Sequence, residues 1–169
     1  MFSLRTAPAL ALLGVALCGC FVQVDVKEVC QRSPAIVVEA AGDAREAPFT
    51  FSRKVAFAVP VDLGDKVTLD VTLERVVLAE VGGPGTVDFL SRVDVAVTPA
   101  ERAIAEPLAL SLAPRGDGAF GFEGAVDVTP LLSGATFHYA VDAEGRLPAA
   151  ARTVEVEACA TATVWLSLP

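Results

Sequence analysis

The segment TVEVEACATATVWLSL, residues 153–168, decides the fold, because an apolar residue occupies every second position along its whole length. A period of two places those side chains on one face of an extended strand, whereas an amphipathic helix needs a period of 3.6. The segment therefore predicts one long, half-buried β-strand. Its apolar positions are Val154, Val156, Ala158, Ala160, Ala162, Val164, Leu166 and Leu168.

The same alternation recurs through the chain, and the helical period is almost absent. Alternating or apolar runs cover residues 22–26, 35–41, 49–59, 67–73, 87–97, 108–113, 119–128 and 137–141. With the C-terminal segment they predict about eight or nine strands, a number and spacing typical of an all-β sandwich or a small barrel. The phase breaks at Arg75-Val76-Val77, where both faces become apolar, so a bulge or burial on both sides is expected there.

Glycine-rich turn signals separate the runs. They are Gly82-Gly83-Pro84-Gly85, Gly116-Asp117-Gly118, Ser133-Gly134 and Glu144-Gly145. Tight turns join antiparallel strands, so we expect an antiparallel β-sandwich, with a small closed β-barrel as the alternative. Residues 143–152 are expected to form the longest loop. One short helix is expected at Thr98-Pro99-Ala100-Glu101, where Thr98 can cap and Pro107 ends it.

The N-terminal residues 1–19 have the layout of an export signal. Arg5 supplies a positive charge, and residues 7–17 are an apolar run about half as long as the ~20 residues that a spanning helix needs. We therefore expect a cleaved signal peptide over 1–19 and a single domain over 20–169, a length that suits one core.

The four residues Leu17-Cys18-Gly19-Cys20 resemble a lipobox, the cleavage signal of bacterial lipoproteins. Gly19 is the small residue before the cut, and Cys20 is the cysteine after it. Cys18 departs from the Ala or Ser usual at the middle position. The resemblance implies a lipoprotein held at a membrane by palmitate and further acyl chains on Cys20. The alternatives are a signal cut by the general peptidase, for which no A-x-A-like site stands out, and a cytosolic protein.

The resemblance also implies a location in the cell envelope. In proteobacterial lipoproteins an Asp directly after the lipidated cysteine favours the inner membrane, and here that residue is Phe21. We expect the outer membrane, with the domain in the periplasm or at the cell surface.

Two cysteines remain once Cys18 leaves with the signal and Cys20 is acylated. Cys30 and Cys159 would then pair, since leftover thiols in an oxidising compartment usually do. Two buried free thiols, or one reactive thiol, are the alternatives.

The charge argues against nucleic acid as a partner. The chain carries a net charge of −8, and loss of Arg5 with the signal makes it −9. An acidic domain without a basic run repels phosphate backbones and anionic lipid. We therefore expect the lipid on Cys20, and not the surface charge, to bind the membrane.

Candidate catalytic and metal-binding residues are few. His138 is the single histidine and no G-x-S-x-G motif accompanies any serine, so we expect a surface histidine and no catalytic triad. One His and two pairing Cys cannot make a zinc site. Asp62-Leu63-Gly64-Asp65, and Asp117-Gly118 with Glu123, do not match a calcium loop and are expected to be turns with solvated acids.

Three further features have an ordinary structural interpretation. Glu155 and Glu157 share one side of a strand about 7 Å apart, a spacing compatible with glycoside hydrolysis but also usual on an outer face. The adhesion-type tripeptide Arg115-Gly116-Asp117 is expected to be a hairpin turn. Trp165 is expected to pack, although a ring there could also stack on a sugar.

These observations favour a lipid-anchored, non-enzymatic binding or structural module of the cell envelope. Its layout resembles small all-β envelope lipoproteins, a resemblance that implies no activity. The partner would be an envelope protein or a glycan, and no cofactor or metal is expected. An envelope hydrolase with a carboxylate site, or an accessory to envelope assembly or export, are the alternatives.

Overall fold

The structure is a computed structural model, and it describes residues 21–42, 48–60, 67–82, 85–98, 106–132 and 134–167. The expected signal peptide over 1–19 and the lipidation site Cys20 lie outside these residues, as does Asp62-Leu63-Gly64-Asp65. Within the described ranges, no helix is long and apolar enough to cross a bilayer.

Nine strands and one 3-10 turn make up the described chain, which confirms the all-β prediction. The strands are β1 (Phe21–Arg32), β2 (Ile36–Val38), β3 (Pro48–Ala58), β4 (Val67–Glu80), β5 (Leu90–Thr98), β6 (Leu108–Pro114), β7 (Phe120–Asp127), β8 (Thr136–Arg146) and β9 (Arg152–Ser167), with η1 at Thr129–Leu131.

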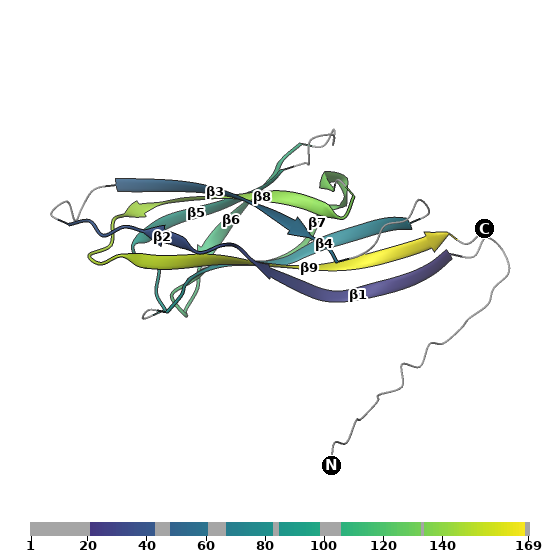
Figure 1. Cartoon of the computed structure of the whole chain (residues 1–169), viewed down its shortest axis with the longest axis horizontal. Coiled ribbons are helices and arrows are strands. Elements are labelled where there is room, and N and C mark those ends of the chain that lie inside the picture. Colours follow the sequence, from purple (N-terminus) through teal and green to yellow (C-terminus); the bar gives the residue numbers. More distant parts are fainter. Residues whose placement is uncertain are drawn as a thin grey trace, which may run out of the picture.

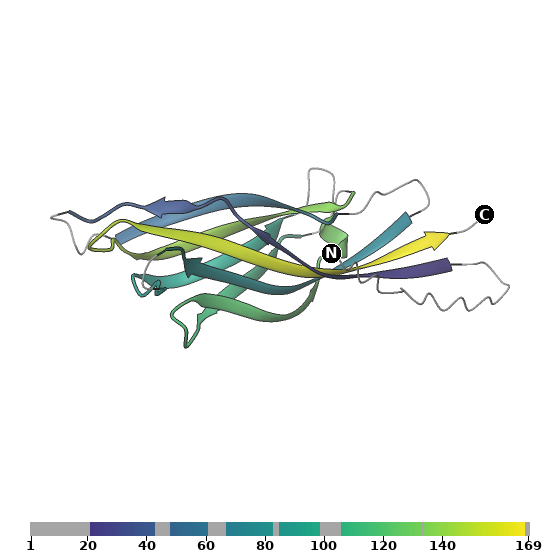
Figure 2. The ribbon, with the colours of Figure 1, turned by 60° about the horizontal axis from the view of Figure 1, so that its bottom comes forward.

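The strands form one curled antiparallel sheet in the order β1-β9-β4-β7-β6-β5-β8-β3, with β2 also paired to β9. The sheet turns over at β6, which pairs with β5 through residues 108–112 and with β7 through Ala113 and Pro114. Its two halves, β1-β9-β4-β7 (the first sheet) and β3-β8-β5-β6 (the second sheet), face each other across the core (Figures 1 and 2). This order is that of a jelly-roll sandwich.

β2 continues β1 along the same partner strand, β9. Between the two strands, Ser33 keeps the pairing intact, because its backbone N–H donates to the Val156 carbonyl at 2.8 Å and its Oγ accepts from the Val156 N–H at 3.0 Å. Ser33 is buried, and these bonds satisfy the polar groups that burial removes from water.

A bulge in β4 accounts for the broken phase that the sequence displays. Leu73 lies opposite Ala160 and Arg75 opposite Cys159, so Glu74 is one residue in excess. Before the bulge the odd-numbered residues face the core, and after it Val76 and Leu78 do. The bulge therefore moves Arg75 to the outer face of the first sheet.

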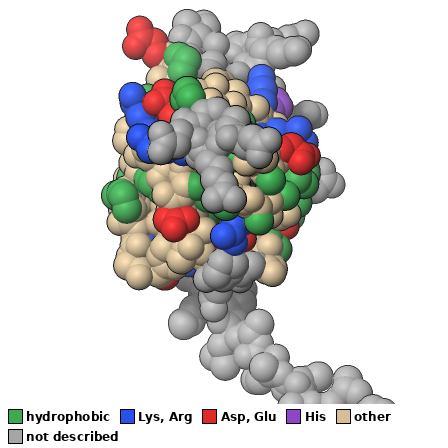
Figure 3. All heavy atoms as spheres, turned by 90° about the vertical axis from the view of Figure 1, so that its left-hand side faces the viewer, with side chains coloured by type: hydrophobic (Ala, Val, Ile, Leu, Met, Phe, Trp, Pro, Cys, Tyr) green, Lys and Arg blue, Asp and Glu red, His purple; other side chains and the backbone are tan. Residues whose placement is uncertain are grey.

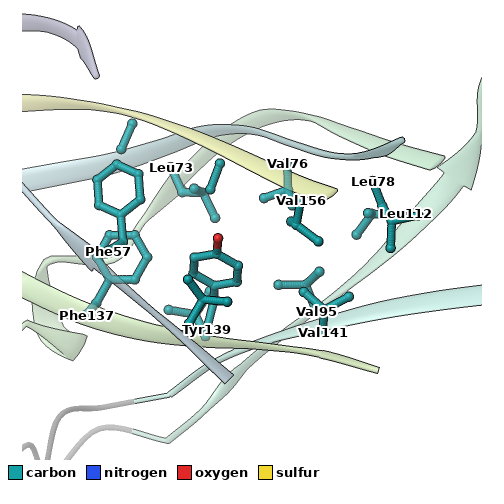
Figure 4. Close-up of a cluster of buried hydrophobic side chains, with 14 of the residues drawn as sticks. Phe57, Leu73, Val76, Leu78, Val95, Leu112, Phe137, Tyr139, Val141 and Val156 are labelled. Atoms are coloured by element: carbon teal, nitrogen blue, oxygen red, sulfur yellow. The ribbon is translucent and has the colours of Figure 1, made fainter. Parts of the chain in front are cut away.

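The core fills the space between the two sheets (Figure 4). The rings of Phe57 and Phe137, on β3 and β8, are stacked with centroids 4.9 Å apart. The hydroxyl of Tyr139 points into this apolar space (Figure 4). The largest fully buried side chains are Tyr139, Phe57, Phe137, Leu73, Leu78, Val71, Val76, Val87, Val93, Val95, Val97 and Val128.

The long loop expected over residues 143–152 was wrong. β8 runs to Arg146 and β9 begins at Arg152, so the connection is only residues 147–151. Gly145 lies inside β8, where a Cβ would collide with the Phe89 carbonyl oxygen. The Arg146 N–H donates to that same oxygen at 2.8 Å. This glycine therefore serves close backbone approach in a strand, not a turn.

One other strand boundary differs from the expected one. Val87 and Phe89 precede β5 in a turn closed by the Leu90 N–H on the Val87 carbonyl at 2.9 Å, so that strand starts later than its alternation suggests. Thr98 ends β5, paired with His138 on β8, and the short helix expected to follow it cannot be compared. Residues 99–105 lie outside the described chain.

The sandwich has two distinct ends. At the proximal end, β1 and β4 begin and β9 finishes, and Val22, Val67 and Leu166 lie in one row. At the distal end are the β2–β3, β4–β5, β6–β7 and β8–β9 connections, on the left of Figure 1. Phe21, which follows Cys20, starts β1 at the proximal end.

Candidate functional site

A cleft of about 490 Å³ lies on the outer face of the first sheet, toward the distal end. Strands β4 and β9 form its floor, and the β6–β7 turn forms one wall. Three arginines and four acidic residues line it, together with the small aliphatic side chains of Val77 and Ala79. It is a shallow, mixed-charge surface feature.

An arginine–glutamate–arginine bridge crosses this cleft. Arg32 and Glu157 are register partners on β1 and β9, and the Arg32 Nε lies 2.9 Å from the Glu157 Oε2. Arg75, placed here by the bulge, brings its Nη2 to 3.2 Å from the Glu157 Oε1. Each carboxylate oxygen of Glu157 thus has its own guanidinium, and the hydrogen bond that Arg32 donates to Glu157 raises the pKa of Arg32.

The disulfide borders the same cleft. Cys30 and Cys159 lie directly opposite each other on β1 and β9 and are joined across 129 residues of sequence, which confirms the predicted pair. Cys159 is fully buried, whereas Cys30 is exposed. The Arg75 Nη2 lies 3.2 Å from the Cys159 Sγ and 3.8 Å from the Cys30 Sγ. The bond fixes the edge strand β1 to the centre of the sheet.

The β6–β7 turn contributes an internally paired set of charges. The Arg115 Nη1 lies 2.6 Å from the Glu123 Oε1, and the Arg115 Nε lies 3.3 Å from the Asp117 Oδ2. The hydrogen bond that Arg115 donates to Glu123 is the main reason that the pKa of Arg115 is raised. The Ala119 N–H, donating to Asp117, lowers the pKa of that carboxyl. As predicted, Arg115-Gly116-Asp117 is a hairpin turn, and its Arg and Asp pair with each other.

The charges of this turn also explain why Asp117 and Glu123 are poor calcium ligands. Both carboxylates converge on the Arg115 guanidinium, which occupies the place a cation would take. A second possible ligand group, Glu28 with Cys30 and Cys159, has its ligand atoms within 4.8 Å of one another. Both sulfurs of that group are used in the disulfide, so neither is a thiolate that could bind a metal.

A buried ion pair lies on the inner face of the first sheet at the distal end. The Glu80 side chain is only 3% exposed, and its Oε1 lies 2.9 Å from the Arg152 Nη1. The Glu80 Oε2 is buried without a hydrogen-bond partner among the described residues. The pair sits at the margin of the core, where Arg152 faces Val38 across the β2–β9 ladder.

An apolar patch adjoins the cleft at this end. Val37 and Val81 are 60% and 43% exposed and flank Thr153: Val37 is its register partner, and the Val81 N–H donates to its carbonyl at 2.8 Å. Figure 3 looks at the distal end, where hydrophobic, basic and acidic side chains are interspersed. An apolar centre with a charged margin is the usual composition of a protein-binding surface.

The other residues considered from sequence lie away from the cleft. His138, half-buried, is on the outer face of the second sheet beside Ala56 and Thr98. Trp165 is half-buried at the proximal end of the first sheet, where its Nε1–H donates to the Asp70 Oδ2 at 2.7 Å. Neither side chain lines the cleft, whereas four other residues considered from the sequence do, namely Arg115, Asp117, Glu155 and Glu157.

Arg32, Arg75 and Glu80 were missed by sequence reasoning. The disturbed phase at Arg75 was the available signal, since a bulge re-aims the side chain beside it. Nothing local marks Arg32 or Glu80, because their partners Glu157 and Arg152 are 125 and 72 residues away.

Comparisons with known proteins give weak structural likenesses. Neither a protein-family model nor a curated protein sequence matches the chain. The decameric BFDV capsid protein is similar with a TM-score of 0.43 and 10% identity, over 85% of this chain and 99% of that chain. The 60-mer BFDV capsid protein has a TM-score of 0.43 and 11% identity, over 89% and 96%. The infectious bursal disease virus Gx strain structure has a TM-score of 0.33 and 7% identity, over 86% and 38%.

Proposed function

We propose that this protein is an exported lipoprotein, anchored through acyl chains on Cys20, whose jelly-roll domain is a non-enzymatic binding module of the cell envelope. The observation that carries the proposal is the sequence Leu17-Cys18-Gly19-Cys20, which resembles a lipobox and directly precedes β1. The outer membrane is the favoured site, because Phe21 and not Asp follows the lipidated cysteine.

The positions of the two ends of the sandwich support an anchor at the proximal end and a binding surface at the distal end. β1 starts at the proximal end with no tether between it and Cys20, so an anchor there would hold that end at the membrane. The cleft and the patch of Val37 and Val81 lie toward the opposite end. An anchored domain would therefore present them away from its own membrane, to another envelope protein or to a glycan.

The chemistry of the cleft favours binding over hydrolysis. A glycosidase needs one carboxyl group that can give up a proton and one that can act as nucleophile or base. Both oxygens of Glu157 are engaged by Arg32 and Arg75 at 2.9 and 3.2 Å, which leaves Glu155 without a carboxyl partner that is free to react. Mixed charges beside exposed valines suit a protein partner.

Acylation tests the anchor directly. Cells that express the wild type or Cys20→Ser are grown with a clickable fatty acid, and we expect the label on the wild type only. An unlabelled wild type, or a labelled Cys20→Ser protein, would overturn the proposed anchor. Cys30→Ser, which spares the lipobox, is the matched control and should keep the label.

A further inference from the structure

The apolar inner face of the first sheet continues to the proximal end, where Val67 and Leu166 are half-buried at the edge of the core and the β1 valines are exposed. Val22, Leu166 and Val67 form the outermost row across β1, β9 and β4. The next row inward is Val24, Val164 and Leu69. Figures 1 and 2 show these three strands running past the ends of β3 and β8 in the second sheet.

Exposure rises toward this tip along β4, and the two β1 valines of the same face are exposed. On β4, Val71 is 1% exposed, whereas Val67 at the start of the strand is half-buried. On β1, Val24 and Val22 are 46% and 41% exposed. The inner faces of these strand ends stay apolar although the second sheet does not extend over them. A strand end with water on both sides would carry polar residues on both faces, so another surface is expected to cover this one.

We propose that this proximal apolar strip, consisting of Val22, Val24, Val67 and Leu166, rests on the bilayer that holds the acyl chains of Cys20. The inference depends on the proposed anchor. At a strand rise of about 3.3 Å per residue, Val22 is within about 7 Å of Cys20, which is inside the depth that interfacial apolar side chains reach. A lipid-anchored Cys20 therefore brings the strip to the membrane.

Because the domain is acidic, its contact with the membrane would be made by apolar side chains and not by charges. The chain without its signal has a net charge of −9, and Asp25 and Asp70 lie on the outer face of the same three strands. Acidic groups are repelled by anionic headgroups, so a zwitterionic bilayer surface is the occupant that fits. A second copy of the chain packed strip to strip is the competing occupant.

The test uses tryptophan quenching by brominated lipid. Trp165 is the single tryptophan, so Trp165→Phe with Val24→Trp places one reporter on the strip. The matched control is Trp165→Phe with Val37→Trp, because Val37 is also an exposed strand valine but lies at the distal end. Acylated protein is reconstituted into phosphatidylcholine vesicles whose acyl chains do or do not carry bromine.

We expect brominated lipid to reduce the emission of the Val24→Trp reporter about twofold, with little change at Val37→Trp. Equal, weak quenching of both reporters in protein that floats with the vesicles would overturn the strip inference and leave the anchor standing. A blue-shifted but unquenched Val24→Trp would show the strip covered by protein, which also overturns it. Protein that carries no acyl chain and does not float overturns the anchor and the inference together.

A second reporter position keeps the test possible if the first substitution disturbs folding. If Val24→Trp loses the strand signal in circular dichroism, Val22→Trp in the same Trp165→Phe background replaces it, since Val22 lies on the same face and closer to Cys20. The same quenching is expected, and its absence in folded, floating protein overturns the inference.

Discussion

Arg75 lies directly opposite Cys159 in the β4–β9 ladder, with its Nη2 3.2 Å from the Cys159 Sγ. The bulge makes this possible, because it leaves Glu74 out of the ladder, so that Arg75 faces outward and Val76 faces the core. The bulge therefore sets both the packing of β4 and the charge beside the disulfide.

Deleting Glu74 should be far less damaging than deleting Val77 from the same strand. Without Glu74, Leu73 still lies opposite Ala160 and Arg75 still lies opposite Cys159, so the ladder becomes regular and every residue keeps its face. Deleting Val77 instead turns Leu78 to the outer face, and we expect it to cost more than about 3 kcal/mol of unfolding free energy in urea denaturation. The Glu74 deletion loses the bulge and the hydrogen bond that Glu74 accepts from Thr161 at 2.9 Å, which should cost about 1 kcal/mol. Similar stabilities for the two deletions would contradict this account of the bulge.

Removal of the disulfide should destabilise the domain by about 4–5 kcal/mol, because the unfolded chain regains the freedom of a loop of 129 residues. The variant is Cys30→Ser with Cys159→Ala, since Cys30 is exposed and Cys159 is buried. Urea denaturation measures the change. A reductant should destabilise the wild type and leave the variant unaffected, and a loss below about 1 kcal/mol would argue against a stabilising bridge.

Tyr139→Phe should leave stability unchanged or raise it by about 1 kcal/mol at neutral pH. The Tyr139 hydroxyl is buried and has no hydrogen-bond partner among the described residues, so folding removes it from water without compensation. Thermal unfolding of the two proteins measures the difference. Phe137→Leu, which disrupts the stacked pair with Phe57, is the control that should destabilise.

The same residue predicts an alkaline loss of stability. Burial raises the pKa of Tyr139 to about 12, whereas the unfolded residue titrates near 10. Between these values the unfolded state releases the proton and the folded state keeps it. The stability of the folded protein is therefore unaffected by this titration below pH 10 and falls as the pH rises toward 12, by on the order of 2–3 kcal/mol. Tyr139→Phe should lack this part of the pH dependence, and an identical alkaline profile would refute it.

Gly145→Ala should destabilise the sandwich by at least about 2 kcal/mol, because its Cβ would meet the Phe89 carbonyl and lie 2.9 Å from the Leu90 Cα. Both obstacles are backbone and cannot swing aside. Gly116→Ala has open space around its Cβ and should stay within about 0.5 kcal/mol of the wild type. Equal effects in chemical denaturation would mean that the strand tolerates a side chain at 145.

A photo-crosslinking residue at Val37 should capture the binding partner in native envelopes, whereas one at Lys54 should not. Val37 borders the cleft, and Lys54 is exposed on β3, in the second sheet. We expect Val81→Asp to abolish the Val37 crosslink, because a charge would enter the apolar patch. The proposed surface would be ruled out by a crosslink that survives Val81→Asp and forms equally at Lys54.

The strands and their faces were predictable because side-chain alternation is local. The phase of Val154 to Val164 identifies the inner face of β9, and the break at Arg75 locates the bulge. The sequence was misleading at Gly145, since a glycine reads as a turn unless the approaching Phe89 backbone is known. The cleft was not predictable, because it depends on which strands become neighbours.

By itself, then, the sequence determined an all-β chain and the inward face of most strands, and the lipobox resemblance led to the expectation of the Cys30–Cys159 bond that the structure contains. Only the tertiary structure decided the jelly-roll order and the bridge that joins Arg32 and Arg75 through Glu157. The physical reason is the distance along the sequence between the residues that interact. A period of two is imposed by the geometry of each strand on its own residues, whereas pairing between residues more than a hundred positions apart is settled by the packing of the whole sheet.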